Sequence, residues 1–315
     1  MFVSVIVCTF SSDNYQHFTG AVDSLLHQTH KEIEIIIVVH GNETLYERIL
    51  RAYDAQDNIN VIGTKESLGA YAARNVGVRR AQGDVIAFLD DDAVAEKGWI
   101  RSLVDTYENL NAIAVGGKIL PIWLCKEPDY FPEELYWLVG VTHKGFAQEK
   151  VSEIRNAFGP NMSFRKEVFA KIGLFNENFG FAKKGTSYIQ AGEAEFALRM
   201  KGKLGKGVTY NPGAIVYHKI PQSKVKVKML LKRAFYQGYS KALLRKFSSS
   251  PEPITTEKSY LKSLLLKYIP QRIKKIYHIS EVKKLSILLA VIVSVGLGFI
   301  YGFMRKGDIE AVSSA

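Results

Sequence analysis

The regular alternation of strand and helix patterns over residues 1–92 is the feature that most constrains the fold. Four short runs of β-branched and aliphatic residues have the length of buried strands, and three stretches with helical spacing of apolar residues separate them. The strand runs cover 2–10, 32–42, 59–64 and 84–92, and the helical stretches cover 17–28, 43–53 and 68–83. This alternation predicts an α/β fold with a doubly wound, mostly parallel sheet flanked by helices.

Polar and glycine residues stand where these predicted strands end. Thr9 closes the first run, Gly41 closes the second, and three consecutive carboxylates, Asp90, Asp91 and Asp92, close the fourth. In open α/β sheets, ligands bind beyond the carboxyl ends of the parallel strands. We therefore expect a ligand site at this edge of the sheet.

The three adjacent carboxylates need a positive partner. Like charges this close repel, and an unpaired carboxylate in a dry site is costly. An Asp-x-Asp pattern suits Mg²⁺ or Mn²⁺, whose coordination is completed by water and substrate phosphates, and which offsets charge on a departing diphosphate. The alternative is a solvated turn with helix-capping aspartates. The position directly after the apolar run 85–89 favours the metal.

The second half of the chain is basic and then strongly apolar. The net charge is +11, and Lys and Arg predominate from residue 201 to residue 284. Such a charge suits nucleic acid, an anionic membrane or an anionic ligand. Residues 285–304 are 20 residues without a charge, between two pairs of basic residues, which is the length of a membrane-spanning helix. A buried core helix is the alternative, but the flanking charges favour one transmembrane helix, and so a membrane rather than nucleic acid as partner.

The location follows from the distribution of charge around this stretch. The amino-terminal run lacks the basic leader and the small-residue cleavage site of a signal peptide. Basic residues crowd the side before the apolar stretch, so the positive-inside tendency predicts a single-pass cell-membrane protein with its large domain in the cytoplasm. Cys8 and Cys125 lack metal-ligand spacing, and we expect no disulfide in a reducing compartment.

Several motifs occur in an order that is typical of one enzyme family. They are VSVIVCTF, HGN after the second predicted strand, GAYAARNVGVRRAQGDVIAFLDDDA, GPNMSFRKEVFAKIGLFNENFG, GEAEFALRM and the late YHK. Over residues 2–218 the chain thereby resembles the inverting nucleotide-sugar glycosyltransferases of family 2, which have the GT-A fold. The resemblance implies a catalytic domain over 1–220. A basic amphipathic juxtamembrane region (221–284), a transmembrane helix (285–304) and a short tail (305–315) are expected to follow.

The resemblance implies which residues bind the nucleotide sugar. Thr9 and Phe10 would contact the nucleotide, and Arg74 would lie over the base or the ribose. Family members commonly have an acidic residue for the base after the second strand, where this chain has Val39 and His40. His40 would replace that residue, or the donor base would differ.

The acidic triplet and a late histidine would hold the metal. By the same resemblance, Asp90 would approach the ribose, Asp91 would be the variable middle residue of the donor site, and Asp92 would bind the metal that bridges the diphosphate. Asp90 is a second candidate ligand. His218, at the end of a predicted strand, would bind the metal or a diphosphate oxygen, and the alternative is a structural histidine.

Inverting transfer needs a base that removes the proton of the attacking hydroxyl. The motif GEAEFALRM offers Glu193 and Glu195, which helical geometry turns to different sides. Alignment on Arg199 places the base of the family on Glu193, with Gly192 where an acidic residue usually stands, and Glu195 is the next candidate. Arg199 would fix a carboxylate, contact phosphate or lie on the surface, and both glutamates could simply belong to a first helical turn.

The anchor and the basic region suggest an acceptor that is itself in the membrane. Residues 223–246 combine helical spacing of apolar residues with Lys and Arg, which predicts a helix in the membrane interface; a packed surface helix is the alternative. We expect a lipid-linked acceptor, a polyprenyl or dolichyl phosphate that already bears a sugar or does not. The rival functions are a nucleotidyltransferase, a membrane-tethered binding protein without activity, and an inactive relative of the transferases.

Overall fold

The computed structural model of the chain describes residues 1–179, 190–247 and 255–304. The chain divides into two compact units. Unit 1 comprises Met1–Pro121, Ala147–Ser187 and Gly192–Lys219, and unit 2 comprises Ile122–Phe146, Tyr188–Ala191 and Ile220–Ala315. The predicted tail, 305–315, lies outside the described residues.

The sheet belongs mainly to unit 1. Its strands are β1 (Val3–Thr9), β2 (Ile33–His40), β3 (Ile59–Thr64), β4 (Val85–Asp90), β5 (Ala93–Ala95), β6 (Ala114–Trp123), β7 (Ser152–Ile154), β8 (Met162–Arg165) and β9 (Val208–Ile220). The helices of this unit are α1 (Tyr15–Leu26), α2 (Glu43–Tyr53), α3 (Ala70–Arg80), α4 (Trp99–Leu110), α5 (Lys166–Ile172) and α6 (Gly192–Leu204).

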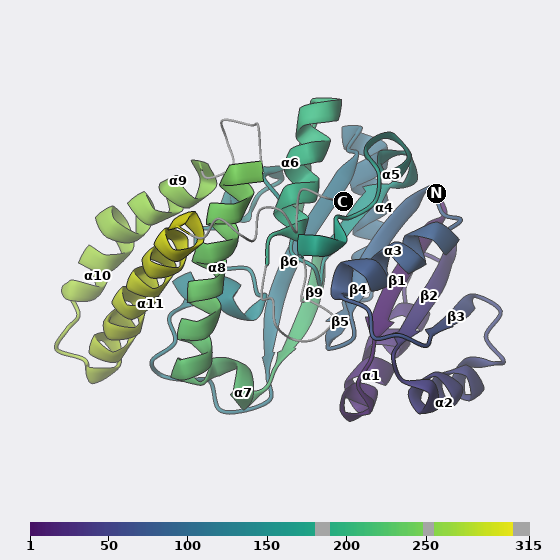
Figure 1. The fold of residues 1–315 in the computed structure, drawn as a ribbon, viewed down its shortest axis with the longest axis horizontal. Helices are drawn as coiled ribbons and strands as arrows, with labels where there is room; N and C mark the ends of the chain where they lie inside the picture. Colours follow the sequence, from purple (N-terminus) through teal and green to yellow (C-terminus); the bar gives the residue numbers. More distant parts are fainter. Residues whose placement is uncertain (180–189, 248–254, 305–315) are drawn as a thin grey trace. The chain divides into compact units, whose positions relative to one another are not determined.

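The strand order confirms the predicted α/β class. The order is β3-β2-β1-β4-β8-β6-β9-β5, with β7 paired to β9. β3, β2, β1 and β4 are parallel, as Figure 1 shows on the amino-terminal side of the sheet. β8 then pairs antiparallel with β4, and β5 and β7 pair antiparallel with β9. The sheet is therefore mixed, with its parallel part where the strand–helix alternation predicts it.

Alternate residues of the strands supply two cores, one on each face of the sheet. Val5 of β1 packs in a cluster with residues of α1, α2 and α4, whereas Ile6 packs in a second cluster with residues of α3, α5 and α6. Both residues are at most 1% exposed. Strands buried on both faces read as continuous apolar runs, which is why the sequence pattern of β1, β2 and β4 identifies them so clearly.

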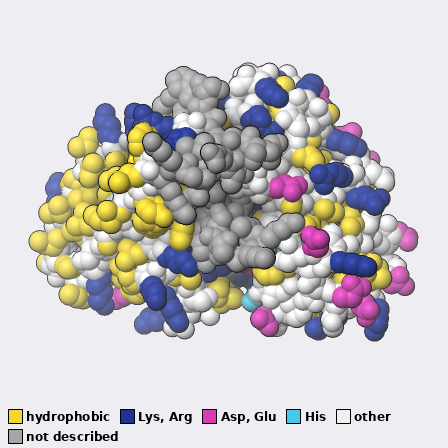
Figure 2. Space-filling model, viewed as in Figure 1, with side chains coloured by type: hydrophobic (Ala, Val, Ile, Leu, Met, Phe, Trp, Pro, Cys, Tyr) yellow, Lys and Arg dark blue, Asp and Glu magenta, His cyan; other side chains and the backbone are white. Residues whose placement is uncertain are grey.

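Unit 2 is mainly helical. After a 3₁₀ segment (Glu133–Val139) come α7 (Gln222–Val225), α8 (Val227–Phe247), α9 (Thr255–Ser263), a π-helical turn (Leu264–Tyr268), α10 (Ile269–Ile273) and α11 (Ile279–Met304). Within the described residues, α11 is the one helix long and apolar enough to span a membrane. In Figure 2, hydrophobic side chains gather over the region where Figure 1 draws α10 and α11. α8 is buried on one face, where Leu230 and Tyr239 are at most 6% exposed, whereas Val227 and Met229 in its first turn are 37–39% exposed. This burial favours a packed helix over the predicted interface helix.

Candidate active site

Three of the predicted site residues lie where parallel strands end. Thr9 is the last residue of β1, His40 of β2 and Asp90 of β4. The parallel registers pair Thr9 with Val39 and Cys8 with Asp90, so the three strand ends lie at one edge of the sheet. This is the edge at which open α/β sheets bind ligands.

Arg74 supplies a positive charge to this edge from helix α3. Its side chain is 10% exposed, and its two Nη atoms lie 3.0 Å from Asp90 Oδ1 and 3.2 Å from Glu193 Oε1. Burial by itself would lower the pKa of Arg74, but the carboxylates of Asp90 and Glu193 outweigh it and raise the pKa. Arg74 is thus a fixed cation that joins the end of β4 to the start of α6, a contact that the sequence argument did not predict.

Tyr71, one helical turn before Arg74, also contacts Glu193. Its hydroxyl donates a hydrogen bond to Glu193 Oε2. Burial, and then the charge of Glu193, raise the pKa of Tyr71 well above its ordinary value, so the phenol stays a donor. A Cβ at position 192 would lie 2.3 Å from Tyr71 Cζ. The glycine that departs from the family pattern therefore provides the space in which the tyrosine reaches Glu193.

The second candidate base, Glu195, lies in a different environment. Both of its carboxylate oxygens accept hydrogen bonds from Arg199, at 2.7 and 3.0 Å. Arg199 also donates to the backbone carbonyls of Ile172, the last residue of α5, and of Leu174, two residues further on. Of the roles considered for Arg199, the structure shows the fixing of a carboxylate.

Asp92 and His218 are brought together by the pairing of β5 with β9. The register places Ala93 opposite His218, and His218 Nε2 lies 3.0 Å from Asp92 Oδ1. A carboxylate and an imidazole are both ligands for divalent metals. Among the described residues no group of three or more His, Cys, Asp or Glu side chains has the spacing of a metal site. The pair therefore fits a metal that takes its remaining ligands from substrate phosphates and water, as Mg²⁺ does in phosphate-binding sites.

Asp91 points toward β1 instead. Thr9 Oγ1 donates a hydrogen bond to Asp91 Oδ2 at 2.7 Å. Burial, followed by the neighbouring charge of Asp92, raises the pKa of Asp91 to about 7. Lys219 is a nearby cation that the sequence argument missed: burial lowers its pKa, and the charges of Asp92 and Asp91 act in the opposite direction. The only sequence signal for it is its place directly after His218.

Phe10 and His40 form a small aromatic surface beside these carboxylates. Their ring centroids are 5.4 Å apart, and Phe10 is 56% exposed although it is large and apolar. His40 is buried, and its Nδ1 accepts a hydrogen bond from the backbone N–H of Leu68 at 3.0 Å. Burial lowers the pKa of His40. The neutral ring therefore carries its proton on Nε2 and can donate from it.

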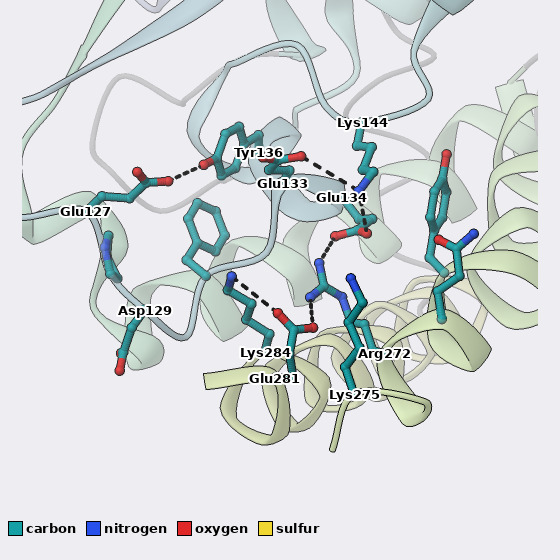
Figure 3. A pocket seen from close by; sticks show the side chains of 14 residues that line it. Glu127, Asp129, Glu133, Glu134, Tyr136, Lys144, Arg272, Lys275, Glu281 and Lys284 are labelled. Carbon is teal, nitrogen blue, oxygen red and sulfur yellow. Dashed lines mark hydrogen bonds and ion pairs between the residues drawn. The ribbon is translucent and has the colours of Figure 1, made fainter. Parts of the chain in front are cut away.

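A separate cavity of about 400 Å³ lies in unit 2 and shares no residue with this cluster. Figure 3 shows Arg272 between Glu134 and Glu281, at 2.6 and 2.7 Å. Five carboxylates and four basic side chains line the cavity, and so mixed a lining does not favour a strongly anionic nucleotide. The strand-end cluster of unit 1 is therefore the candidate active site.

A mixed sheet of this order, with an Asp-x-Asp after a central parallel strand and a glutamate from a later helix beside it, defines a nucleotide-sugar glycosyltransferase of the GT-A type. The model of Glycosyl transferase family 2 matches residues 4–173, and the chain belongs to this family. The chain is 38% identical over 318 residues to a glucosyl-dolichyl phosphate glucuronosyltransferase of Haloferax volcanii, and the match covers 100% of both chains. It is 32% identical over 120 residues to glycosyltransferase AglE of the same organism, covering 38% of this chain and 39% of AglE.

Solved structures confirm the predicted GT-A fold. The mannosyltransferase PcManGT of Pyrobaculum calidifontis, in complex with GDP-Man and Mn²⁺, matches with a TM-score of 0.57 at 14% identity, covering 99% of this chain and 78% of that one. GalNAc-T7 with UDP, GalNAc and Mn²⁺ matches with a TM-score of 0.56 at 14% identity, covering 84% of this chain and 54% of that one. The family excludes a nucleotidyltransferase, the rival enzyme that the sequence left open.

Proposed function

We propose that this enzyme transfers a sugar from a UDP-sugar, with inversion, to a sugar hydroxyl on a dolichyl or related polyprenyl phosphate. The observation that carries the proposal is the position of Glu193, which Tyr71 and Arg74 hold beside Asp90 at the ligand-binding edge of the sheet. The full-length similarity to a glucosyl-dolichyl phosphate glucuronosyltransferase supports the lipid-linked acceptor and makes a glucuronosyl donor the first to test.

Glu193 is the proposed general base. Each carboxylate oxygen has two lone pairs, so contacts with Tyr71 and Arg74 leave acceptor capacity for an incoming hydroxyl. These two donors fix the rotamer of the base. The base takes the proton of the acceptor hydroxyl as its oxygen attacks the anomeric carbon and the nucleoside diphosphate leaves. Glu195 is not available for this role while Arg199 binds both of its oxygens.

The donor nucleotide is proposed to bind along the ends of β1, β2 and β4. Phe10 offers an exposed ring on which a base can stack, and the Nε2–H of His40 can donate to a base carbonyl in place of the acidic residue of the family. Asp90 would accept from the ribose, and the Thr9–Asp91 hydrogen bond would shape the floor beneath the donor.

Asp92 and His218 are the proposed ligands of Mg²⁺ or Mn²⁺, with Asp90 a less direct candidate because Arg74 binds it. When bound, the metal would offset the negative charge that builds up on the leaving diphosphate. Lys219 adds a cation of this chain near Asp91 and Asp92, and so supports binding of the same diphosphate.

Unit 2 is proposed to hold the enzyme at the cytoplasmic side of the cell membrane, within reach of lipid-linked acceptors. α11 has the length and composition of a spanning helix. The sequence predicts that α11 crosses the membrane once. The measurement that tests this prediction is the side of the membrane on which the carboxyl end of the chain lies.

The test is a transfer assay with full-length protein in detergent, dolichyl phosphate-linked glucose as acceptor and a panel of UDP- and GDP-sugars. We expect one donor to give lipid-linked product with Mn²⁺, and chelation to abolish it. Equal transfer to free glucose would contradict the lipid-linked acceptor. Absence of product with every donor, while nucleotide and Mn²⁺ still bind, would support the inactive relative instead.

A further inference from the structure

The carboxyl half of α11 packs against α8 with almost no space between the two backbones. A Cβ on Gly298 of α11 would lie 1.8 Å from the carbonyl oxygen of Phe235, and a Cβ on Gly238 of α8 would lie 1.9 Å from that of Val295. Glycines permit such close approach of helices. One face of this part of α11 is therefore covered by α8.

The two helices run in the same direction, and their carboxyl ends meet. Ser294 Oγ donates to the carbonyl of Leu231 at 2.8 Å, one contact near the start of the paired region. At its other end, Lys246 Nζ donates to the carbonyls of Gly302 and Phe303, both at 3.0 Å. A lysine of α8 thus caps the last turn of α11 and places a charge where the far end of a spanning helix would be.

The segment α9–α10 runs back along α11 in the opposite direction. Lys241, in the last turns of α8, lies 2.9 Å from Glu257 at the start of α9. At the other end of the segment, Arg272 of α10 lies 2.7 Å from Glu281 in the first turn of α11 and 2.6 Å from Glu134 (Figure 3). α9–α10 therefore extends along most of α11, and α8 extends along the carboxyl half of α11.

A crossing by α11 would carry its two charged neighbours into the hydrocarbon. Away from the two ends of α11, α8 contains Lys232 and Arg233 beside the Leu231–Ser294 contact, and the returning segment contains Lys262 and Lys267. Ionisable side chains at the bilayer centre are costly and rare. The bundle as a whole is therefore unsuited to crossing a bilayer. Because α11 is packed within this bundle, α11 would have to cross together with these charged helices.

The same bundle nevertheless exposes many apolar side chains, which gather over α10 and α11 in Figure 2. On α11, Leu289, Val293, Leu297, Ile300 and Met304 recur every three or four residues and are 47–75% exposed. On α9–α10 and the turn after it, Leu261, Leu265, Leu266, Ile273 and Ile276 are 41–69% exposed. We call these ten side chains the lipid face. Lys262, Lys267, Lys274 and Lys275 are exposed between the residues of its second row, as in helices that lie in an anionic membrane interface.

We propose that unit 2 inserts its lipid face into one leaflet of an anionic bilayer and that α11 does not cross the membrane. The lysines of α9–α10 lie at headgroup level, and the capped end of α11 stays on the same side as unit 1. This mode of attachment does not depend on which sugar the enzyme transfers, so its test is independent of activity.

The first test is sidedness. Full-length protein with one epitope at the amino end and another at the carboxyl end is placed in sealed right-side-out and inside-out vesicles, and protease is added outside. We expect both epitopes to be cleaved in the same preparation and protected in the other. Cleavage of the two epitopes in opposite preparations would overturn the proposal and establish a single crossing.

The second test is flotation of purified protein with phosphatidylcholine vesicles, with and without phosphatidylglycerol. We expect binding to require the anionic lipid, and Leu266→Glu or Val293→Glu to weaken it roughly tenfold through the lost burial of one large apolar side chain. Leu110→Glu is the control, because Leu110 is 52% exposed on α4 of unit 1. Equal loss of binding in the control variant would show that the protein adsorbs to vesicles non-specifically. A stable dimer that no longer binds vesicles would show that a second copy of the chain covers this face. Either result would overturn the proposal.

Discussion

Arg74 explains how carboxylates from distant parts of the sequence share one edge of the sheet. The acidic triplet by itself predicts a positive partner near Asp90, and a divalent metal is the expected one. The structure adds a permanent cation of the chain itself, 3.0 Å from Asp90 and 3.2 Å from Glu193. A guanidinium in this place holds both carboxylates in position in the absence of any ligand, so the base and the donor site are organised before the substrates bind.

Glu193→Gln is the most direct test of the proposed base. An amide cannot accept the proton of the acceptor hydroxyl, so we expect kcat to fall roughly 10²- to 10⁴-fold with nucleotide binding retained. The measurement is steady-state transfer together with titration of the nucleoside diphosphate.

Glu195→Gln is the matched control on the same helix. It weakens the pair with Arg199 because an amide offers one acceptor oxygen where the carboxylate offers two, so we expect a loss of about 1 kcal/mol in unfolding free energy, with activity largely kept. The opposite pattern, an inactive Glu195→Gln and an active Glu193→Gln, would transfer the role of base to Glu195.

Gly192→Ala tests whether Gly192, which departs from the family pattern, leaves the space that the ring of Tyr71 occupies. The added methyl would lie 2.3 Å from the tyrosine ring, so we expect about 1–3 kcal/mol of destabilisation by overpacking and a lowered kcat as Glu193 loses its fixed rotamer. Gly202→Ala, also in α6, has no neighbouring atom within 4 Å and should stabilise by about 0.5–1 kcal/mol. Thermal unfolding and transfer rates check both. Equal behaviour of the two variants would argue against this role of Gly192.

At the scale of the elements, packing changes the roles that composition alone predicts for α8 and α11. Taken alone, α8 has the composition of an interface helix and α11 that of a spanning helix. Gly238 and Gly298 instead bring their backbones together, and Lys246 closes the end of α11. The lipid face then lies on α11 and α9–α10, while α8 becomes the inner support.

Gly298→Ala should disrupt this support. Its methyl would meet the carbonyl oxygen of Phe235 at 1.8 Å, and a backbone atom cannot move aside as a side chain can. We expect about 1–3 kcal/mol of destabilisation, seen as earlier unfolding in detergent and faster proteolysis of unit 2. Gly296→Ala on the same helix meets nothing within 4 Å and should be neutral or stabilising. If Gly298→Ala were as stable as Gly296→Ala, the close α8–α11 pairing would be wrong.

At the scale of the whole molecule, binding of the donor should be visible as stability. A ligand that binds only the folded state adds about 2.7 kcal/mol at one hundred times its dissociation constant. The proposed metal pair couples this gain to a divalent cation, because Asp92 and His218 supply only part of a coordination shell.

Mn²⁺ with UDP should therefore raise the unfolding midpoint more than either component alone. Asp92→Asn should remove the part that depends on Mn²⁺, whereas Asp105→Asn, which alters an exposed pair with Arg101 on α4, should keep it. The measurement is differential scanning fluorimetry over a titration of each component. A shift that is identical in both variants would exclude Asp92 as a metal ligand.

The sequence by itself determined the class of fold and the edge at which the site lies. Buried parallel strands must be continuously apolar, and helices between them must repeat every three to four residues, so β1, β2 and β4 and the strand-end aspartates could be read directly from local pattern. The family resemblance added Glu193 as the expected base, ahead of Glu195.

Only the tertiary structure decided which of these residues meet. Tyr71 and Arg74 lie about 120 positions before Glu193, and no local pattern records such a contact, since it depends on how α3 and α6 pack on the sheet. The same is true of Asp92 with His218, which the β5–β9 register joins, and of α11 with α8, whose backbones meet at glycines. Hydropathy describes a helix alone, whereas the depth that a helix can reach depends on the charges of the neighbours packed against it.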